Sequence, residues 1–158
     1  MKLSDKGKRL LMEWEGFKAE IYKDSVGLDT IGVGHLLTHD EINLGEIVLE
    51  DEQAVKFEDG LTEDQVLSLL ARDVRKFERV IQDVRVGLKQ NEFDALVIFA
   101  FNVGVHAFVR STLLEELNAG AYENVPRELR RWNRAGGQVV KGLSNRREKE
   151  IALWNDAI

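Results

Sequence analysis

Apolar residues recur at helical spacing in several segments of the chain. Behind Ser4, which is a favoured N-cap residue, such a stripe predicts a helix over residues 4–15. A second stripe follows a capping-box pattern formed by Thr62 and Gln65, and it predicts a helix of about twenty residues over 62–82. Each of these amphipathic segments requires a core against which its apolar face can pack.

The second half of the chain is also dominated by helical patterns. Residues 91–101 are apolar on nearly every side, which is typical of a helix at the centre of a domain. Three further helices are predicted: 111–118 capped by Ser111, about 125–134 with Asn124 as cap and Pro126 in the first turn, and Ser144 to Trp154. The pair Gly136-Gly137 interrupts the chain before the last of them.

One region has a residue pattern that is typical of strands and not of helices. Residues 21–34 hold β-branched and aromatic residues around Gly27 and predict a small β-hairpin. The acidic segment 39–59 predicts only a short helix near residues 41–44. The fold class expected is therefore α+β and mostly α.

The order of these elements predicts one domain over residues 1–158, since this length suits a single domain. We expect a small lobe over about 15–61, a connecting helix over about 62–82 and a helical lobe over about 83–158. The helix over 4–15 is expected to pack on the helical lobe.

Composition narrows the class of protein. Because the chain contains no cysteine, neither a disulfide framework nor a thiolate zinc site is available. The net charge of −6 argues against a nucleic-acid partner. The charge is uneven, with an acidic segment over 40–64 and a basic one over 127–150. A basic patch can steer an anionic polymer, but it is more often a solvated helix face.

No apolar run approaches the ~20 residues needed to span a bilayer, so no membrane insertion is expected. Residues 1–9 become amphipathic too early for a secretory signal. We therefore expect a protein that is made in a cytoplasm and stays there until something else releases it.

Two carboxylates stand out because Glu15 ends the first helix and Asp24 enters the hairpin. Side chains at such a junction can converge on a cleft, and glycoside hydrolysis requires a pair of carboxyl groups. Spacing alone is weak evidence, because the chain has 28 acidic residues and most charged residues are simply solvated. Helix geometry also leaves Glu13 open as an alternative to Glu15.

Two other motifs carry competing interpretations. Gly32-Val33-Gly34 is a weak phosphate-loop pattern without a following Lys-Ser/Thr, so a sharp turn of the second strand is favoured. His35 and His39 have the spacing of two zinc ligands on a helix, but Leu36 stands where a zinc protease has its glutamate. We therefore expect no metal and no cofactor, with a structural role for His35.

A resemblance decides between these alternatives. The run from Glu15 to Asp24, followed after five residues by Thr30-Ile31-Gly32-Val33-Gly34-His35-Leu36-Leu37-Thr38, closely resembles the active-site signature of the phage lysozyme (endolysin) family. The resemblance continues in order through Phe101-Asn102-Val103-Gly104, Ser111-Thr112-Leu113-Leu114 and Gly142-Leu143-Ser144-Asn145-Arg146-Arg147. It covers nearly the whole chain apart from residues 39–59.

The resemblance implies a two-lobed lysozyme fold with Glu15, Asp24 and Thr30 as catalytic residues. Glu15 would be the general acid, kept protonated by packing of Trp14 and Phe17 around it. Asp24 would stay ionised and, with Thr30, would hold the attacking water of an inverting hydrolase.

The same resemblance implies that Leu36, Phe101 and Ser111 line the saccharide groove, although plain core packing explains Leu36 and Phe101 nearly as well. Pro126 departs from the pattern, since some relatives have a polar groove residue there. Arg146 is expected to pair with Glu15 behind the active site, and such a pair would favour the ionised form of Glu15.

Asp73 falls within the apolar stripe of the helix over 62–82, where a charged side chain requires a partner. His35 follows the hairpin and is the best-placed candidate. An ion pair with Asp73 would raise the pKa of His35 above its ordinary value.

These observations predict a monomeric bacteriolytic muramidase that acts on bacterial peptidoglycan. A lytic transglycosylase acting on the same bond is one alternative, and a non-catalytic glycan-binding module on a lysozyme scaffold is another. Asp24 and Thr30 together favour hydrolysis, because a transglycosylase can work with one acid.

Overall fold

The structure is a computed structural model that describes residues 1–158. Contacts divide the chain into two compact units. The sheet unit comprises Lys8–Arg75, and the helical unit comprises Met1–Gly7 together with Lys76–Ile158. The division runs through the helix predicted over 4–15, between Gly7 and Lys8, and the packing of that helix on the helical lobe stays a prediction.

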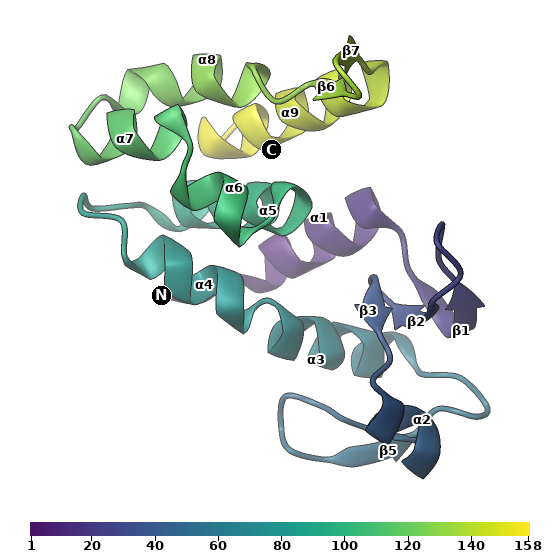
Figure 1. Cartoon of the computed structure of the whole chain (residues 1–158). Coiled ribbons are helices and arrows are strands. Elements are labelled where there is room, and N and C mark those ends of the chain that lie inside the picture. The colour runs from purple at the N-terminus through teal and green to yellow at the C-terminus, as the bar shows by residue number, and fades with distance from the viewer. The chain divides into compact units, whose positions relative to one another are not determined.

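In the sheet unit, the hairpin predicted around Gly27 is present and is extended by a third strand. The strands pair antiparallel in the order β1-β2-β3 (Figure 1). The elements are α1 (Asp5–Glu15), β1 (Lys18–Lys23), β2 (Asp29–Gly32) and β3 (His35–Leu36).

One face of this sheet packs on α3 (Glu63–Asp73). Ile31 is fully buried and pairs with His35, which contacts Asp73 of α3. At the end of β2, Gly32 has φ +64°, so the strand alternation ends there, and a Cβ atom added to it would lie 3.6 Å from Leu69 Cδ2 of α3. The capping box predicted at Thr62 and Gln65 is formed in full. The buried side of the sheet is therefore fixed against a well-capped helix.

The acidic segment is more structured than the sequence indicated. The expected short helix is present as α2 (His39–Leu44), which begins with a capping box between Thr38 and Glu41. It is followed by a hairpin of β4 (Glu46–Val48) and β5 (Ala54–Lys56), which the sequence did not predict.

The single helix expected over 62–82 is interrupted. It consists of α3 and α4 (Arg75–Gln82), with Val74 between them. Val74 has φ −78° and ψ −10°, so its ψ is much less negative than the value of about −42° in an ideal helix. The N–H of Val74 still donates to Leu70 O, but this ψ interrupts the regular helical geometry between α3 and α4.

The helical unit is built around α5 (Gln90–Val103), in which residues 93–100 are all buried, as the apolar pattern predicts. It packs against α9 (Lys141–Trp154), and α9 packs against α8 (Val125–Arg130) (Figure 1). The remaining elements are α6 (Val105–Val109), α7 (Thr112–Asn118), the 3-10 helix η1 (Tyr122–Asn124), β6 (Arg134–Ala135) and β7 (Gln138–Val139).

One predicted helix cap and one predicted helix start differ in the structure: α8 begins at Val125 as expected but lacks the side-chain cap, and α9 begins earlier than expected. Asn124 makes no side-chain cap bond, because η1 brings it into a helical conformation with φ −87° and ψ −14°. The last helix begins at Lys141, not Ser144, since the Ser144 N–H already donates to Val140 O. Gly136 and Gly137, both with positive φ, form the turn of the β6–β7 hairpin that leads into it.

Within the helical unit, the segment Met1–Gly7 is held to the rest of the unit by two buried carboxylates. The Leu3 N–H donates to Glu78 Oε2 at 2.6 Å, and the Ser4 N–H donates to Asp94 Oδ1 at 3.0 Å. Ser4 also caps α1 as predicted, since its hydroxyl accepts from the Gly7 N–H at 2.9 Å. None of the helices is long and apolar enough to cross a membrane.

Candidate active site

Glu15 is the last residue of α1, and Gly16, with φ +76°, ends the helix directly behind it. The Glu15 side chain is exposed, and Phe17 is 43 % exposed. The packing expected to shield Glu15 from water is therefore not provided by Phe17. Glu13 is exposed as well, so burial does not separate the two glutamates.

Asp24 organises the turn between β1 and β2. Its Oδ1 atom accepts hydrogen bonds from the N–H groups of Val26 and Leu28, both at 2.9 Å. This is an Asx-type turn, in which a short carboxylate replaces a backbone carbonyl, and Gly27 supplies the positive φ that the turn requires. The turn uses Oδ1 and leaves Oδ2 without a protein partner.

Thr30 lies in β2 and is 2 % exposed. Its hydroxyl donates to Leu28 O at 3.0 Å, in the same turn that Asp24 organises. With its proton used in this bond, Oγ1 presents only lone pairs to any other partner. Asp24 and Thr30 are thus both hydrogen-bonded to the turn over residues 24–28, and both offer hydrogen-bond acceptors.

The pairing register places three residues on one face of the sheet. Thr30 pairs with Tyr22 on one side and with Leu36 on the other. Because directly paired residues point to the same face, Tyr22, Thr30 and Leu36 share a face, and the opposite face packs on α3. Leu36 is 52 % exposed, so this front face presents an apolar side chain to solvent.

On the back face, His35 joins the sheet to α3. Its Nδ1 atom lies 2.8 Å from Asp73 Oδ2, the contact that the sequence predicts. Its Nε2 atom lies 3.0 Å from Glu41 Oε1, a partner that was not predicted from the sequence. Since His35 lies in a strand and His39 in α2, the two histidines are not on one helix face as the zinc interpretation required.

The ionisation of His35 follows from these contacts. Burial of the imidazole opposes its charge, but the hydrogen bonds and negative charges of Asp73 and Glu41 together outweigh burial, so the pKa of His35 is raised. The pKa of Glu41 is lowered, because the Thr38 N–H and His35 outweigh the effect of its own burial. Arg72 lies 3.9 Å from Glu41 and adds a further positive charge.

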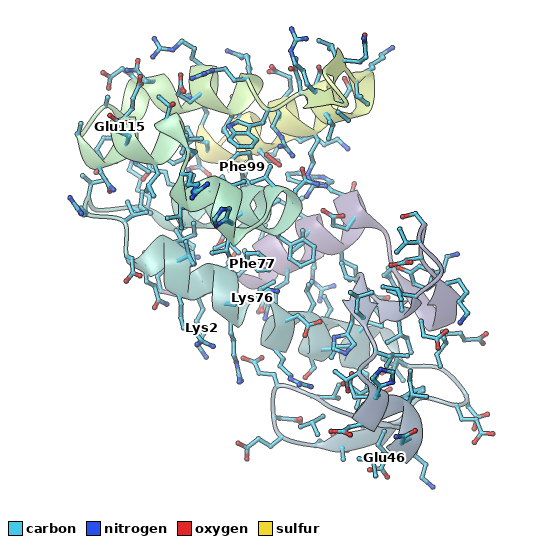
Figure 2. The ribbon with its side chains drawn as sticks, viewed as in Figure 1. Lys2, Glu46, Lys76, Phe77, Phe99 and Glu115 are labelled. Carbon is cyan, nitrogen blue, oxygen red and sulfur yellow. The ribbon has the colours of Figure 1, made fainter.

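The remaining predicted site residues belong to the helical unit. Phe101 is half-buried and packs on Phe77, which is labelled in Figure 2, with ring centroids 5.3 Å apart. Ser111 is 7 % exposed and caps α7: its hydroxyl donates to Phe108 O at 2.6 Å and accepts from the Leu114 N–H at 3.1 Å. Both residues therefore have structural roles in addition to the saccharide contacts expected of them.

Arg146 lies in α9, where its Nε atom is 3.2 Å from the fully buried Glu150. Arg147, also buried, lies 3.0 Å from the same carboxylate and 5.0 Å from the ring centroid of Phe99. This buried cluster was not predicted from the sequence, although the spacing of Arg146 and Arg147 from Glu150 places all three on neighbouring turns of one helix. The expected pairing of Arg146 with Glu15 stays a prediction.

The basic segment over 127–150 is largely neutralised. Arg130 donates to Glu148 at 2.7 Å, which raises the pKa of Arg130 and lowers that of Glu148. Arg131 pairs with Glu128 at 2.7 Å, and Arg127 pairs with Glu116 at 3.1 Å. These pairs favour the solvated-face interpretation of the segment.

Comparison with known proteins gives a consistent result. A model of the phage lysozyme family matches residues 12–150. The chain is 35 % identical to the endolysin of Salmonella phage P22, with 98 % of each protein covered. It is 37 % identical to the endolysin of Bacillus phage PZA over 98 % of the chain, but it spans only about half (55 %) of the length of that relative.

Solved structures resemble the fold over nearly the full chain. A mutant of P22 lysozyme superposes with a TM-score of 0.82 and 33 % identity, covering 98 % of this chain and 99 % of the other. The muramidase domain of SpmX from Asticaccaulis excentricus gives a TM-score of 0.77 and 27 % identity, with 97 % of both chains covered.

Proposed function

Because the chain belongs to the phage lysozyme family, we propose that it is a bacteriolytic endolysin which hydrolyses bacterial peptidoglycan. The bond cleaved is the β-1,4 linkage between N-acetylmuramic acid and N-acetylglucosamine. The protein acts as a monomer without cofactor, and it is released from the host cytoplasm to the cell wall.

Glu15 is the general acid that protonates the oxygen of the leaving sugar. Its position supports this role, since an exposed carboxyl at the end of a helix can approach a polymer that never enters the interior. Glu13, which is also exposed on α1, is assigned no role.

The proposed position of the attacking water rests on two hydrogen-bond acceptors at the Asp24 turn. A water molecule can donate one proton to Asp24 Oδ2 and the other to Thr30 Oγ1, because both atoms are left to accept after the turn has formed. The lone pairs of that water then remain for attack on the anomeric carbon. Direct attack by water inverts the configuration at that carbon.

Leu36, Phe101 and Ser111 are proposed to contact the saccharide. Leu36 is the best supported of these, since it shares the front face of the sheet with Thr30 and is exposed. An apolar side chain on that face suits the apolar face of a sugar ring.

The test is digestion of purified peptidoglycan followed by analysis of the products. Hydrolysis leaves a reducing end that first appears as the α-anomer if the enzyme inverts, whereas a lytic transglycosylase leaves a 1,6-anhydro sugar. Glu15→Gln should lower the rate at least ~10²-fold, while Glu13→Gln should retain most activity. A wild-type protein that binds the wall and releases no product would instead be a glycan-binding module.

A further inference from the structure

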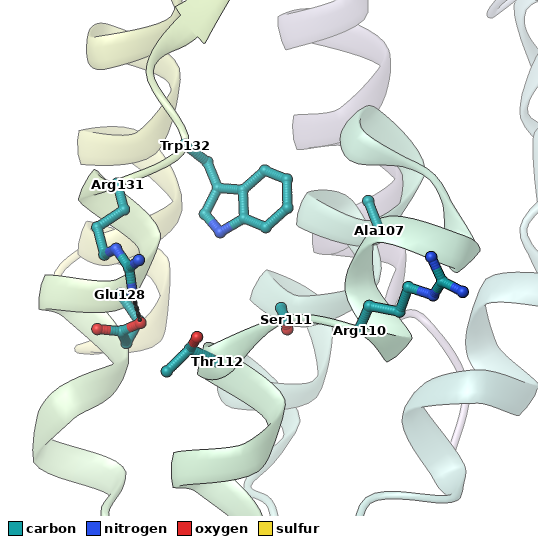
Figure 3. Close-up of a pocket in the computed structure, with 7 residues that line it drawn as sticks. All are labelled: Ala107, Arg110, Ser111, Thr112, Glu128, Arg131 and Trp132. Carbon is teal, nitrogen blue, oxygen red and sulfur yellow. Dashed lines mark hydrogen bonds and ion pairs between the residues drawn. The ribbon is translucent and has the colours of Figure 1, made fainter.

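Two carboxylates, Glu128 and Asp24, differ in how completely their oxygens are used. In the helical unit, Figure 3 shows Glu128 and Arg131 on the wall of a cavity, where they pair at 2.7 Å. Arg127 lies 3.6 Å from the other oxygen of the same carboxylate. In the sheet unit, Asp24 binds its turn through Oδ1 alone. The surface around Asp24 therefore keeps hydrogen-bonding capacity for a ligand.

Leu28 is the residue on which the hydrogen bonds of this turn converge. Its N–H donates to Asp24 Oδ1 at 2.9 Å, and its carbonyl oxygen accepts from the Asp24 N–H at 2.9 Å. The same carbonyl oxygen accepts from the Thr30 hydroxyl at 3.0 Å. The backbone of Leu28 therefore holds both residues of the proposed water site.

The side chain of Leu28 lies on the front face of the sheet. Continued into the turn, the antiparallel register of β1 and β2 brings Asp24 opposite Leu28. Side chains two positions apart along a strand point to the same face, and Leu28 is two positions before Thr30. Leu36 pairs directly with Thr30, so it is a diagonal neighbour of Leu28 at a distance of about 7–8 Å.

Two exposed leucines thus flank the proposed water site. Leu28 is 51 % exposed and Leu36 is 52 % exposed. A single exposed leucine is common on a protein surface and requires no explanation. Here the two share one face with the remaining acceptors of Asp24 and Thr30. A saccharide placed for attack by a water on those acceptors would therefore cover both leucines.

Covering Leu28 changes the environment of the hydrogen bonds made by its backbone. The bonds from Val26 and Leu28 to Asp24 are exposed in the free protein, and the bond from Thr30 is partly buried. An exposed hydrogen bond contributes little because water competes for the same groups, whereas exclusion of water strengthens it. A sugar ring on the Leu28 side chain excludes water from the turn and so fixes the two acceptors in place.

We propose that Leu28 is a positioning residue, whose side chain contacts the saccharide and whose backbone then fixes Asp24 and Thr30 around the attacking water. The proposal rests on the proposed function, because it assumes that a saccharide lies on this face. Leu36 shares the saccharide contact but not the hydrogen bonds to Asp24. Because positioning takes effect in the transition state, Leu28 should act on kcat, whereas a uniform contact acts on KM.

The experiment measures kcat and KM on solubilised peptidoglycan strands. Leu28→Ala keeps the backbone hydrogen bonds of the turn and removes the side chain, so kcat should fall about tenfold while KM rises no more than about threefold. Leu36→Ala should raise KM more than it lowers kcat. Leu44→Ala is the matched control, since Leu44 is a 73 % exposed leucine on α2 of the same unit, outside the sheet.

Three further variants separate the saccharide contact from the flexibility of the turn. Leu28→Met keeps an apolar side chain of similar volume and should recover most of the wild-type kcat, whereas Leu28→Asn should behave like Leu28→Ala. Val26→Ala truncates another exposed apolar side chain of the turn and should lower kcat less than Leu28→Ala does. Equal losses in these two alanine variants, or equal kcat in Leu28→Ala and Leu44→Ala, would overturn the proposal.

Positioning is measured apart from turnover by NMR hydrogen exchange of the Leu28 amide, which donates to Asp24. In the Glu15→Gln background, a tetrasaccharide of alternating N-acetylglucosamine and N-acetylmuramic acid can bind without being consumed. Saturation with it should slow this exchange about tenfold, but not when Leu28→Ala is added. An unchanged rate in saturated Glu15→Gln protein would overturn the proposal. A wild-type protein that releases no product from peptidoglycan would instead overturn the proposed function.

Discussion

The Nδ1 atom of His35 lies 2.8 Å from Oδ2 of Asp73, and this contact joins the three-stranded sheet to α3. The Asp73 side chain is 25 % exposed and the His35 side chain only 10 %. A charge-assisted hydrogen bond shielded to this extent contributes more than an exposed ion pair does. It should therefore be visible in the dependence of stability on pH.

The pKa of His35 is raised above its ordinary value of 6.5, so its stabilising effect is fully present below pH 6.5 and is lost as pH rises through the folded pKa. Asp73→Asn should lower the free energy of unfolding by about 1–3 kcal/mol below that pH and by less in alkali. Urea denaturation across the pH range is the measurement. NMR titration of the His35 ring that gave a folded pKa at or below 6.5 would contradict the prediction.

The contribution of Glu41 to stability depends on pH in the opposite sense to that of His35. Its pKa is lowered below 4.5, so its contribution is present above pH 4.5 and is lost as pH falls through the folded value. Glu41→Gln should keep the capping box, because a glutamine oxygen can still accept from Thr38, and should remove the charge beside His35. The pKa of His35 should then fall while α2 persists. Loss of the α2 amide signals would show that the charge, and not the cap, holds this helix.

Asp24→Asn tests the water site without disturbing the turn. An asparagine oxygen can accept from Val26 and Leu28 as Oδ1 does, but the amide group would present a donor where Oδ2 now presents an acceptor. We expect hydrolysis of cell walls to be nearly abolished and the melting temperature to change by no more than a few degrees. An active Asp24→Asn variant would exclude Asp24 from the reaction.

Thr30→Glu replaces the proposed water site with a carboxylate. After exposure to cell wall, mass spectrometry should detect a covalent sugar adduct, since the carboxylate would attack in place of water. Thr30 is 2 % exposed, so the larger side chain will also strain the fold. Thr30→Gln has the same size without the nucleophile and is the control. Detection of the unmodified mass alone in a folded Thr30→Glu protein would argue against a water at Thr30.

Gly7 and Gly142 offer a paired test of close packing, as both lie in helices and neither has positive φ. A Cβ atom at Gly7 would lie 2.6 Å from Leu3 Cδ1 and 3.0 Å from the Asp94 carboxylate, so Gly7→Ala should cost about 1–3 kcal/mol of stability. Nothing lies within 4 Å of a Cβ at Gly142, and Gly142→Ala should gain up to about 1 kcal/mol. Thermal unfolding of both variants distinguishes packing from helix propensity, and equal effects would contradict the close approach at Gly7.

Elements with a signal contained in a few neighbouring residues were predictable from the sequence. Thr62 and Gln65 form their capping box within four residues, and the hairpin at Gly27 is similarly local. The β4–β5 hairpin was missed because strands of three residues leave too short a pattern to recognise. The start of α9 was misplaced because Ser144 resembles an N-cap residue. In the structure the helix begins three residues earlier, at Lys141, shortly after the β6–β7 hairpin.

The candidate site was predictable to a different degree. No local pattern distinguishes Glu15 from Glu13, and the choice came from the family resemblance. The turn held by Asp24 is a local feature, since its carboxylate bonds to residues two and four positions ahead. The second partner of His35 was not predictable, because Glu41 already satisfies a local capping pattern and its contact with His35 depends on the tertiary fold.

The attachment of Met1–Gly7 to the helical unit determines the order in which the chain can fold during synthesis. The first residues leave the ribosome early, but their partners Glu78 and Asp94 follow 75 and 90 residues later. The sheet unit is continuous over Lys8–Arg75, so its chain is complete before the main part of the helical unit, Lys76–Ile158, has been synthesised. Closing so long a loop is entropically slow, and contacts of such high sequence separation form late.

Because of the same attachment, a fragment that contained only Lys76–Ile158 would lack a segment that belongs to the helical unit. A chain beginning at Lys76 would bury Asp94, which is 2 % exposed, without the two donors that Ser4 supplies. Moving residues 1–7 to the far end of that fragment would restore those donors. In such a rearranged chain the helical unit would be one continuous segment, although the contacts of Leu3 with Glu78 and of Ser4 with Asp94 would still close long loops.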